Sequence, residues 1–402
     1  MKVLVFTKLF WPEGGGAELA THLVVGLLSR HFDVSVVSGT ARPEPAVLRQ
    51  VRYLQWNALR SRYKPDEWLR LLAGARHVWR LLERADVVYI PSHTLMPLAI
   101  AAKLAKPSIK VVLHLHNYQA LTFTSVILAD QEPNMITDVT VELRERRSLV
   151  KSVLIGFGHY LNFLNSYALR YADKVICVSR RQYEIMTYHL PWLRNKAVII
   201  YNPPPNLPII AKKADEIPLF IYPGGGSYVK GFHIFLKLLT KILLKKNSEL
   251  RIFVTYGRDV AFPERLILEN LSQKICGRLV VLGRLPYSEY LKLHERAWGL
   301  LFPSTWGEPL PYAVVESALL GTVPVASRVG GVPEIVEGTP AEEYLFTPGS
   351  AEELAERVEA LASQPRERVL EVGAKLRERA LKLFDVERIE SELAGLFESL
   401  RN

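Results

Sequence analysis

The sequence is poor in cysteine, with only Cys177 and Cys276 in 402 residues. Both lie in or beside apolar strand-like runs, so we interpret them as buried free thiols in a reducing compartment. No window reaches the roughly 18 uninterrupted apolar residues of a transmembrane helix. The first apolar run, KVLVF, is short and soon interrupted, and it predicts a strand rather than a signal peptide.

The sequence also lacks the patterns of two functional classes. His114 and His116 end the run KVVLHLH on one face of a predicted strand, with His116 at its end. The further Cys or His ligands that zinc would need do not accompany them, so we predict no metal site. Motifs that combine aromatic and basic residues for nucleic-acid binding are missing as well, so nucleic acid is not an expected partner.

The positive charge lies entirely in the first half of the chain. Residues 1–202 carry 26 Lys and Arg against 15 Asp and Glu, so their net charge is +11, whereas the remainder carries −1. This asymmetry indicates an anionic partner for the first half. The alternative is that the high isoelectric point only aids solubility.

Apolar strand-like runs alternate with helical patterns in both halves, and the length predicts two domains. This alternation predicts an α/β fold with two Rossmann-like parallel-sheet domains that face each other across a cleft. The proline-rich stretch NPPPNLPIIAKKADEIP (202–218) marks the boundary. We therefore expect a first domain at 1–202, a linker at 203–217 and a second domain at 218–385. The predicted strands are 2–6, 33–38, 51–56, 86–90, 110–116, 174–179, 197–201, 218–223, 250–257, 279–283, 298–303, 323–327 and 343–346; helical patterns cover 17–30, 66–84, 231–246, 287–297 and 351–363.

The segment FPSTWGEPLPYAVVESALLG (302–321) places two glutamates around the start of a predicted helix. Glu308 precedes a proline, which favours extended backbone, and the helix is expected to begin at Pro311. The free backbone N–H groups of Tyr312, Ala313 and Val314 then form an anion site. Because Glu316 lies one to two turns further on, roughly 10 Å away, the spacing suits a nucleoside diphosphate sugar. A solvated helix face with a favourable first-turn acid is the simpler alternative.

In each half, one glycine-rich turn follows the first strand. WPEGGGAELA contains Gly14 to Gly16, and glycines there let the backbone approach a ligand closely. YPGGGSYVKGF places Lys230 beside a helix start, where an anion would offset its charge. A surface lysine on a tight turn is the alternative.

In their order, these motifs resemble the retaining GT-B glycosyltransferases of family 4 over nearly the whole chain. The residues that carry the resemblance are GGAE (15–18), HN (116–117), VICVS (175–179), IYNP (200–203), GGGSYVKG (224–231), LGRLP (282–286), PSTWGEPLPYAVVESALLGTVPVASRVGGVPEIV (303–336) and LFTPGSAEELAE (345–356).

The resemblance implies a role for each matching residue. Glu308 would contact the donor hexose, Glu316 the ribose, and Lys230 the diphosphate without a metal, with His116 as a further catalytic residue. A C-terminal helix at 386–402 is expected to return to the first domain. The remaining nucleotide-sugar contacts are Gly15, Gly16, Arg284, Leu285, Leu310, Pro311, Tyr312 and Ala313.

Three positions depart from the family pattern. The usual loop arginine falls at Gly225, and Arg284 is a candidate to replace it. Pro311 stands where a glycine is usual, which removes one amide, and Asn202 is followed by proline instead of glycine.

The segment 121–174 joins apolar runs to a basic cluster, a combination that suits a helix at a membrane surface. Two amphipathic helices covering the first sheet are the alternative. The residues of the cluster are Arg144, Arg146, Arg147 and Lys151.

The sequence thus predicts a retaining hexosyltransferase with a UDP- or GDP-sugar donor. We expect a lipid-linked or glycan acceptor and a cytoplasmic location, peripheral to the anionic inner face of the plasma membrane. A soluble enzyme that glycosylates a sugar or sugar phosphate, of the sucrose- or trehalose-forming type, is the alternative.

Overall fold

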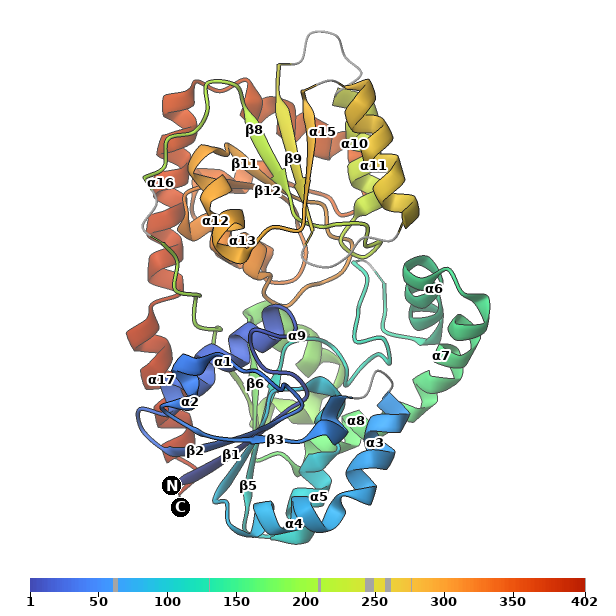
Figure 1. Ribbon diagram of the computed structural model, residues 1–402, viewed down its shortest axis with the longest axis vertical. Coiled ribbons are helices and arrows are strands. Elements are labelled where there is room, and N and C mark those ends of the chain that lie inside the picture. Colours follow the sequence, from blue (N-terminus) through green and yellow to red (C-terminus); the bar gives the residue numbers. More distant parts are fainter. Residues whose placement is uncertain are drawn as a thin grey trace.

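Two parallel sheets organise the chain, one in each half, and helices cover both (Figure 1). The computed structural model describes residues 1–60, 64–129, 131–208, 211–242, 249–256, 262–275 and 277–401. Cys177 is a buried free thiol at the end of a strand, and burial raises its pKa to about 12. Cys276 lies outside the described residues.

The first sheet has seven strands in the order β3-β2-β1-β4-β5-β6-β7, and all neighbours are parallel. Its strands are β1 (Lys2–Thr7), β2 (Asp33–Ser38), β3 (Arg52–Gln55), β4 (Val87–Ile90), β5 (Lys110–Leu115), β6 (Lys174–Cys177) and β7 (Ala197–Ile199). The central strand β4 is buried along its whole length, as a parallel strand covered on both faces should be. The helices of this half are α1 (Gly16–Leu28), α2 (Pro45–Leu48), α3 (Lys64–Ala73), α4 (Ala75–Glu83), α5 (Leu98–Ala105), α6 (Met135–Arg146), α7 (Leu149–Leu161), α8 (Phe163–Ala168) and α9 (Arg180–His189), with 3₁₀ turns at Asn57–Arg60, His93–Leu95, Leu169–Tyr171 and Pro191–Asn195.

The second sheet has six parallel strands in the order β10-β9-β8-β11-β12-β13. Its strands are β8 (Leu219–Tyr222), β9 (Arg251–Thr255), β10 (Leu279–Gly283), β11 (Gly299–Phe302), β12 (Val323–Ser327) and β13 (Leu345–Phe346). The helices are α10 (Phe232–Ile242), α11 (Phe262–Lys274), α12 (Tyr287–Arg296), α13 (Tyr312–Leu319), α14 (Val332–Val336), α15 (Ala351–Ala362), α16 (Arg366–Leu383) and α17 (Val386–Glu398), with a 3₁₀ turn at Pro340–Tyr344.

The predicted α/β fold with two parallel-sheet domains is confirmed, and every predicted strand coincides with an observed one. The helical pattern 66–84 divides into α3 and α4 at Gly74. A Cβ atom at this glycine would lie 2.3 Å from the Trp56 ring, so the break lets that ring pack closely. Residues 243–246 of the predicted helix 231–246, and residue 257 of a predicted strand, lie outside the described residues.

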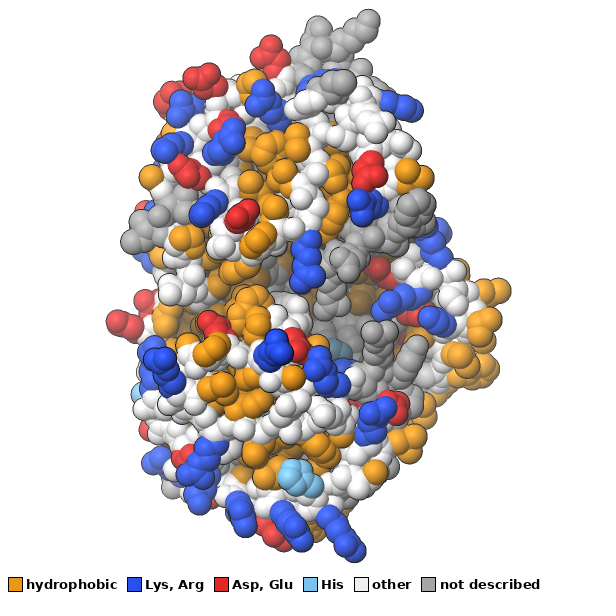
Figure 2. Space-filling model, in the orientation of Figure 1, with side chains coloured by type: hydrophobic (Ala, Val, Ile, Leu, Met, Phe, Trp, Pro, Cys, Tyr) orange, Lys and Arg blue, Asp and Glu red, His pale blue; other side chains and the backbone are white. Residues whose placement is uncertain are grey.

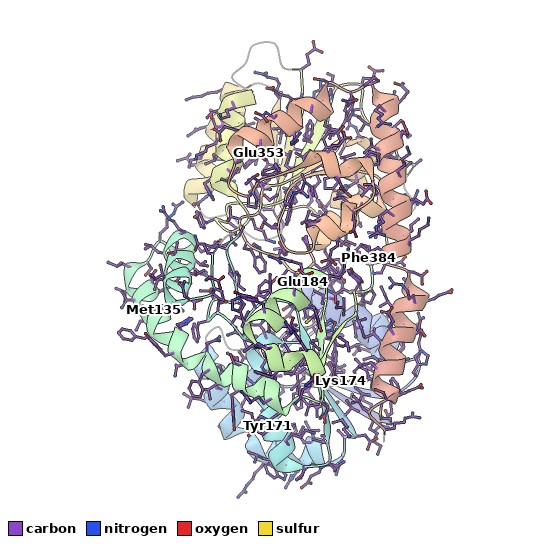
Figure 3. The ribbon with its side chains drawn as sticks, turned by 180° about the vertical axis from the view of Figure 1, so that it is seen from behind. Met135, Tyr171, Lys174, Glu184, Glu353 and Phe384 are labelled. Carbon is purple, nitrogen blue, oxygen red and sulfur yellow. The ribbon has the colours of Figure 1, made fainter. Side chains whose placement is uncertain are left out.

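The chain passes between the two sheets twice. After β7 it runs through the proline-rich segment, where the buried Lys212 ammonium donates to the Thr322 hydroxyl at 2.7 Å. Burial lowers the pKa of Lys212 to about 7. Near the C-terminus the chain passes back at Phe384, which lies between α16 and α17 (Figure 3). The carboxylate of Glu390 in α17 then accepts a hydrogen bond from Arg30 of the first half at 2.7 Å.

The α6–α7 hairpin projects from the side of the first half, close to the start of α10 in the second (Figures 1 and 3). Within the described part of the chain, none of the helices combines the length and the hydropathy that crossing a bilayer requires.

Candidate active site

The glycine-rich loop after β8 carries Lys230 into the space between the two sheets. Gly231 has φ +78°, and a Cβ atom there would lie 1.7 Å from the Pro303 carbonyl oxygen, so only glycine allows this approach. The Lys230 ammonium forms an ion pair with the Glu308 carboxylate. The side chains of Lys230 and Glu308 are 33% and 18% exposed, so both are accessible to solvent.

The backbone of Glu308 rests on the glycine pair that follows β12. A Cβ atom on Gly330, whose φ is +50°, would lie 1.9 Å from the Glu308 carbonyl oxygen. The N–H of Gly331 donates to that same oxygen at 3.2 Å. The V-G-G motif therefore holds the predicted hexose-binding glutamate through its main chain.

The start of α13 differs from the sequence prediction. Pro311 is the residue before the helix, with extended backbone (φ −76°, ψ 114°), and the helix begins at Tyr312. The N–H of Val314, predicted to be free, donates to the Pro311 carbonyl at 3.0 Å. The carbonyl of an extended residue before a helix accepts the first such bonds, so the predicted backbone anion site is reduced to the Tyr312 and Ala313 amides.

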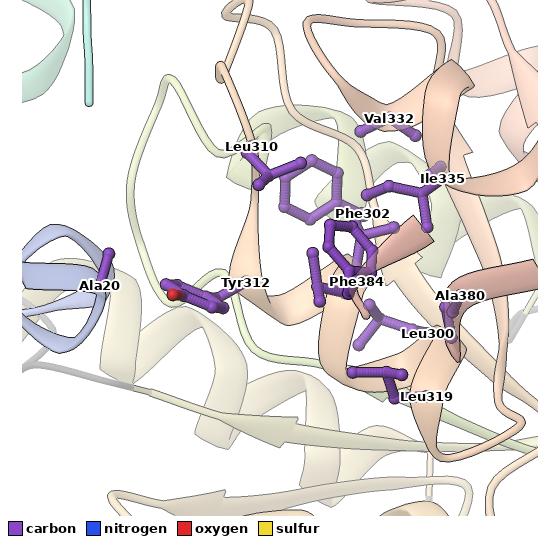
Figure 4. Close-up of a cluster of buried hydrophobic side chains, with 14 of the residues drawn as sticks. Ala20, Leu300, Phe302, Leu310, Tyr312, Leu319, Val332, Ile335, Ala380 and Phe384 are labelled. Carbon is purple, nitrogen blue, oxygen red and sulfur yellow. The ribbon is translucent and has the colours of Figure 1, made fainter. Parts of the chain in front are cut away.

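Leu310 packs inward from this loop. Its side chain is 8% exposed and belongs to the hydrophobic core, together with Phe302, Val332 and Ile335 (Figure 4). Leu310 therefore anchors the loop, and only its main chain is available to a ligand.

Glu316 lies in the second turn of α13 and is almost completely buried, with 5% of the residue exposed. Its carboxylate accepts a hydrogen bond from the Tyr287 hydroxyl at 2.6 Å. Burial raises the pKa of Glu316 to about 7, although the Tyr287 bond acts in the opposite direction. Both protonation states are thus populated near neutral pH.

His114 and His116 come from the carboxyl end of β5, and their ring centroids are 4.4 Å apart. His114 is fixed by the Tyr89 hydroxyl, which lies 2.6 Å from its Nδ1. The Nε2 of His116 is buried and has no hydrogen-bond partner among the described residues. Burial lowers the pKa of His116 to about 4, so its imidazole is neutral at pH 7 and suited to hydrogen bonding rather than to carrying charge.

Gly15 and Gly16, at the N-terminus of α1, face the start of α13 from the other sheet. A Cβ atom on Gly16 would lie 3.2 Å from the Tyr312 ring, which is already a tight contact. Figure 4 shows Tyr312 opposite Ala20 of α1. The two helix starts thus meet at the same place between the sheets.

The position expected to hold the loop arginine is occupied by Gly225, which has φ +57°. An arginine would rarely adopt that backbone conformation, which agrees with the departure seen in the sequence. Arg284 follows β10 and is exposed, while Leu285 is half-buried. The main chain of Tyr256 connects the glycine-rich loop to the end of β10. It forms a bridge with Gly224, and its N–H donates to the Gly283 carbonyl.

Glu334 connects the two halves of the molecule, a role that the sequence analysis did not assign. Its buried carboxylate accepts hydrogen bonds from the N–H groups of Arg180 and Arg181 at the start of α9, at 3.0 and 2.8 Å. The Tyr201 hydroxyl donates to it at 2.6 Å. The only signal in the sequence was the glutamate that ends the motif V-G-G-V-P-E.

A second connection joins the loop before Glu308 to the first half. Leu128 and Trp306 form an antiparallel bridge. On either side of it, the Ala129 N–H donates to the Thr305 carbonyl and the Gly307 N–H to the Ile127 carbonyl, both at 2.8 Å. The main chain leading to Glu308 is thus attached to the first half by strand-like pairing.

The four basic residues assigned to a membrane surface divide into two pairs. Arg147 forms an ion pair with Glu264 of the second half, and the Arg144 guanidinium lies 5.9 Å from the centre of the Tyr228 ring. These two side chains face the glycine-rich loop, because the C-terminal end of α6 is packed against it. All four residues have solvent-exposed surface, Arg144 and Arg147 included.

Helix α7 exposes its large apolar side chains and buries its small ones. Ser152, Gly156 and Gly158 are buried. A surface helix of a protein in water has the opposite arrangement, so the alternative of an ordinary amphipathic helix does not describe α7. Figure 2 shows this apolar surface at the edge of the molecule, with Lys and Arg side chains beside it. Its residues and their exposed fractions are Leu149 (70%), Val150 (72%), Val153 (50%), Leu154 (63%), Phe157 (70%) and Leu161 (46%).

Potential metal ligands do not gather in this site. Across the described residues, no three His, Cys, Asp or Glu side chains come together in a way that could hold a metal ion.

Two family descriptions match the chain. "Glycosyltransferase Family 4" matches residues 13–203, and "Glycosyl transferases group 1" matches residues 206–382. Among curated proteins, an uncharacterized glycosyltransferase of Methanocaldococcus jannaschii is 29% identical over 125 residues. That match covers 31% of this chain and 30% of the relative, so it spans less than a third of the relative's length.

Solved structures match over nearly the whole chain. Anabaena HepE in complex with UDP-glucose is 19% identical, with a TM-score of 0.70 and coverage of 99% of this chain and 100% of that one. Sucrose-phosphate synthase from Thermosynechococcus elongatus is 18% identical, with a TM-score of 0.75 and coverage of 99% and 98%. The lipopolysaccharide outer core galactosyltransferase WaaB is 14% identical, with a TM-score of 0.63 and coverage of 99% and 100%. At these identities the likeness shows a shared fold.

We predict that Glu334→Gln loosens the two halves without unfolding either. The variant loses the charge in its bonds to the α9 amides, worth about 3 kcal/mol. Small-angle X-ray scattering should show a larger radius of gyration, while circular dichroism stays unchanged. The matched control is Glu343→Gln, at an exposed position of the same half. An unchanged scattering curve for Glu334→Gln would contradict the conclusion that Glu334 holds the two halves together.

We also predict that Glu316 makes the fold less stable as the pH rises. Its pKa in the folded protein, about 7, lies above the ordinary value of 4.5, so the folded state binds the proton more tightly than the unfolded state. The cost of ionising Glu316 is absent below the ordinary value and grows until the pH passes the folded value, to a total of about 3 kcal/mol.

The Glu316→Gln variant should therefore match the wild type at about pH 4 and exceed its stability at about pH 8 in urea unfolding. Glu289→Gln, at an exposed position of α12, should show no such trend. A stability difference between Glu316→Gln and the wild type that does not change with pH would refute the raised pKa.

Proposed function

The chain belongs to glycosyltransferase family 4 and has the GT-B fold, and from this we propose that it transfers a hexose from a nucleoside diphosphate sugar to an acceptor. We further propose that the donor is a UDP- or GDP-sugar and that transfer retains the anomeric configuration. The acceptor is a lipid-linked molecule or glycan at the cytoplasmic face of a membrane. The reaction needs no metal.

The observation that carries this proposal is the Lys230–Glu308 pair beside the start of α13. A lysine ammonium has three donors, so Lys230 can hold Glu308 and a phosphate oxygen together. In a nucleoside diphosphate sugar the phosphate is bonded to the anomeric carbon of the hexose. A group that binds both the phosphate and the carboxylate therefore brings Glu308 to the hexose.

The remaining groups of the site fit the other parts of such a donor. The Tyr312 and Ala313 amides and the α13 dipole favour a phosphate. Glu316, held by Tyr287, presents a carboxyl for the ribose hydroxyls. The neutral imidazole of His116 can share a hydrogen bond with a hydroxyl of the hexose.

Membrane attachment is supported by the exposed apolar face of α7 together with Arg146 and Lys151. Burying one Leu or Phe side chain contributes about 1.5–3 kcal/mol, and each basic residue near an anionic surface about 1 kcal/mol. A few such groups are enough for reversible binding of the folded protein to a bilayer. The first half carries the charge excess of +11, which agrees with an anionic surface.

A soluble acceptor is the second candidate, because sucrose-phosphate synthase shares the fold. Nucleotide sugars can first be screened by thermal shift, since a ligand that binds only the folded state raises its stability. A labelled product that partitions into a lipid extract supports the lipid acceptor. Label that stays in the aqueous phase would contradict the lipid acceptor and support the soluble one.

We predict that Glu308→Gln lowers turnover by about two to four orders of magnitude, because a contact to the transition state is lost. Binding of the nucleoside diphosphate, measured by calorimetry, should remain. In Lys230→Ala, by contrast, binding of the nucleoside diphosphate should weaken, while binding of the free nucleoside should be unchanged. Activity should persist in excess chelator. Turnover near the wild-type level in Glu308→Gln would remove this residue from the mechanism.

We predict that the protein sediments with vesicles of phosphatidylcholine and phosphatidylserine, less with phosphatidylcholine alone, and that high salt releases it. The double variant Leu154→Ser, Phe157→Ser should lower the partition coefficient about a hundredfold, from the lost apolar burial. The matched control is Leu381→Ser on α16, where the leucine is 54% exposed. Equal losses in the double variant and the control would overturn membrane docking by α7.

A further inference from the structure

A cavity of about 600 Å³ lies between the C-terminal end of α6 and the start of α10. Leu143, Arg144 and Arg147 line it from the first half, and Tyr228 and His233 line it from the second. Lys230 and Glu308 do not line this cavity, which shares only Gly226 and Tyr228 with the glycine-rich loop that carries Lys230. Neither the family descriptions nor the likeness to solved structures assigns it a ligand.

Arg144 brings a positive charge to the cavity, and the lining residue His233 has a buried ring nitrogen without a partner among the described residues. Arg144 has no carboxylate partner within the described part of the chain, and its guanidinium lies over the Tyr228 ring. The His233 ring stacks on the same tyrosine, with centroids 4.5 Å apart and planes 15° apart. The Nδ1 of His233 is buried, and no hydrogen bond to it is found among the described residues.

The surrounding charges favour an anion. Burial, Lys237 and Arg144 together lower the pKa of His233, so its ring already lies in a positive field. His233 also lies in the first turn of α10, whose dipole adds to that field. Arg147 is the exception, because Glu264 already pairs with it.

The cavity lies between the glycine-rich loop that carries Lys230 and the apolar face of α7. On one side, the Glu145 carboxylate accepts hydrogen bonds from the Ser227 hydroxyl and the Val229 N–H, at 2.7 and 2.8 Å, in the loop that ends at Lys230. On the other side, α6 passes directly into α7, where Leu149 and Val150 are exposed. A ligand with a phosphate and a long apolar chain has both features that this arrangement would recognise.

We propose that this cavity binds the phosphate of a lipid phosphate, with Arg144 and His233 as the contacts and the apolar chain along α7. The acceptor is then a phosphate- or diphosphate-linked lipid rather than a neutral one. Its identification as the acceptor rests on the proposed function, whereas the binding of a phosphate at this site does not.

The test is calorimetric titration of the full chain with hexyl phosphate, a lipid phosphate too short to require vesicles. Arg144→Gln should weaken binding about tenfold, through loss of a charge-assisted hydrogen bond. His233→Phe keeps the ring that stacks on Tyr228 and should also weaken binding, through loss of its nitrogens. The matched control is Arg146→Gln, which removes the same charge from the same helix at a position that does not line the cavity.

Lys230→Ala should retain the binding of hexyl phosphate, which separates this site from the donor site. Equal weakening in Arg144→Gln and Arg146→Gln would reduce the effect to general surface charge and overturn the site. Equal affinity for inorganic phosphate and hexyl phosphate would overturn the assignment to a lipid. Because no turnover is measured, loss of the proposed transferase activity would leave these results standing.

Discussion

The carboxylate of Glu334 at the N-terminus of α9 is the contact on which the geometry between the two sheets depends. It accepts two backbone N–H groups and the Tyr201 hydroxyl, all from the first half of the chain. Glu334 itself belongs to α14, directly after the glycines that hold the Glu308 main chain. The same short segment thus positions the predicted hexose-binding glutamate and fixes the second half against the first. A buried carboxylate at a helix start is stabilised by both the amides and the dipole.

Burial favours the neutral form of two groups in the site, although it moves their pKa values in opposite directions. Burial lowers the pKa of His116 to about 4, which keeps its imidazole neutral, and raises the pKa of Glu316 to about 7. Lys230 stays partly exposed and forms an ion pair with Glu308. The positive charge and free amides lie where a diphosphate would bind, and the groups suited to neutral hydroxyls lie to either side. This division follows the chemistry of a nucleotide sugar, which carries its charge in the middle.

The α6–α7 hairpin connects this site to the outer surface. Its inner end touches the loop that carries Lys230 through Glu145. Its outer side presents the apolar residues of α7, while glycine and serine fill the contact inside the hairpin. Small residues let the two helices pack closely, and the large side chains are left for a partner. The proposed lipid-binding surface and the loop proposed to bind phosphate are therefore joined by one supersecondary unit.

The sequence by itself determined the two parallel sheets, since strands buried on both faces read as apolar runs, and the order of its motifs was enough to identify the family. It also located Lys230 and Glu308 in loops that follow strands, and Glu316 inside the next helix, because proline restricts the backbone locally and glycine permits tight turns. Only the tertiary structure decided that Arg144 and Arg147 face the second half, that Glu334 joins the halves, and that the large residues of α7 point outward. Each of these depends on which distant segment lies opposite, and local periodicity carries no information about that neighbour. The pKa of Glu316 belongs to the same class, because burial by the whole domain raises it and residues far along the chain, such as Tyr287, complete its surroundings.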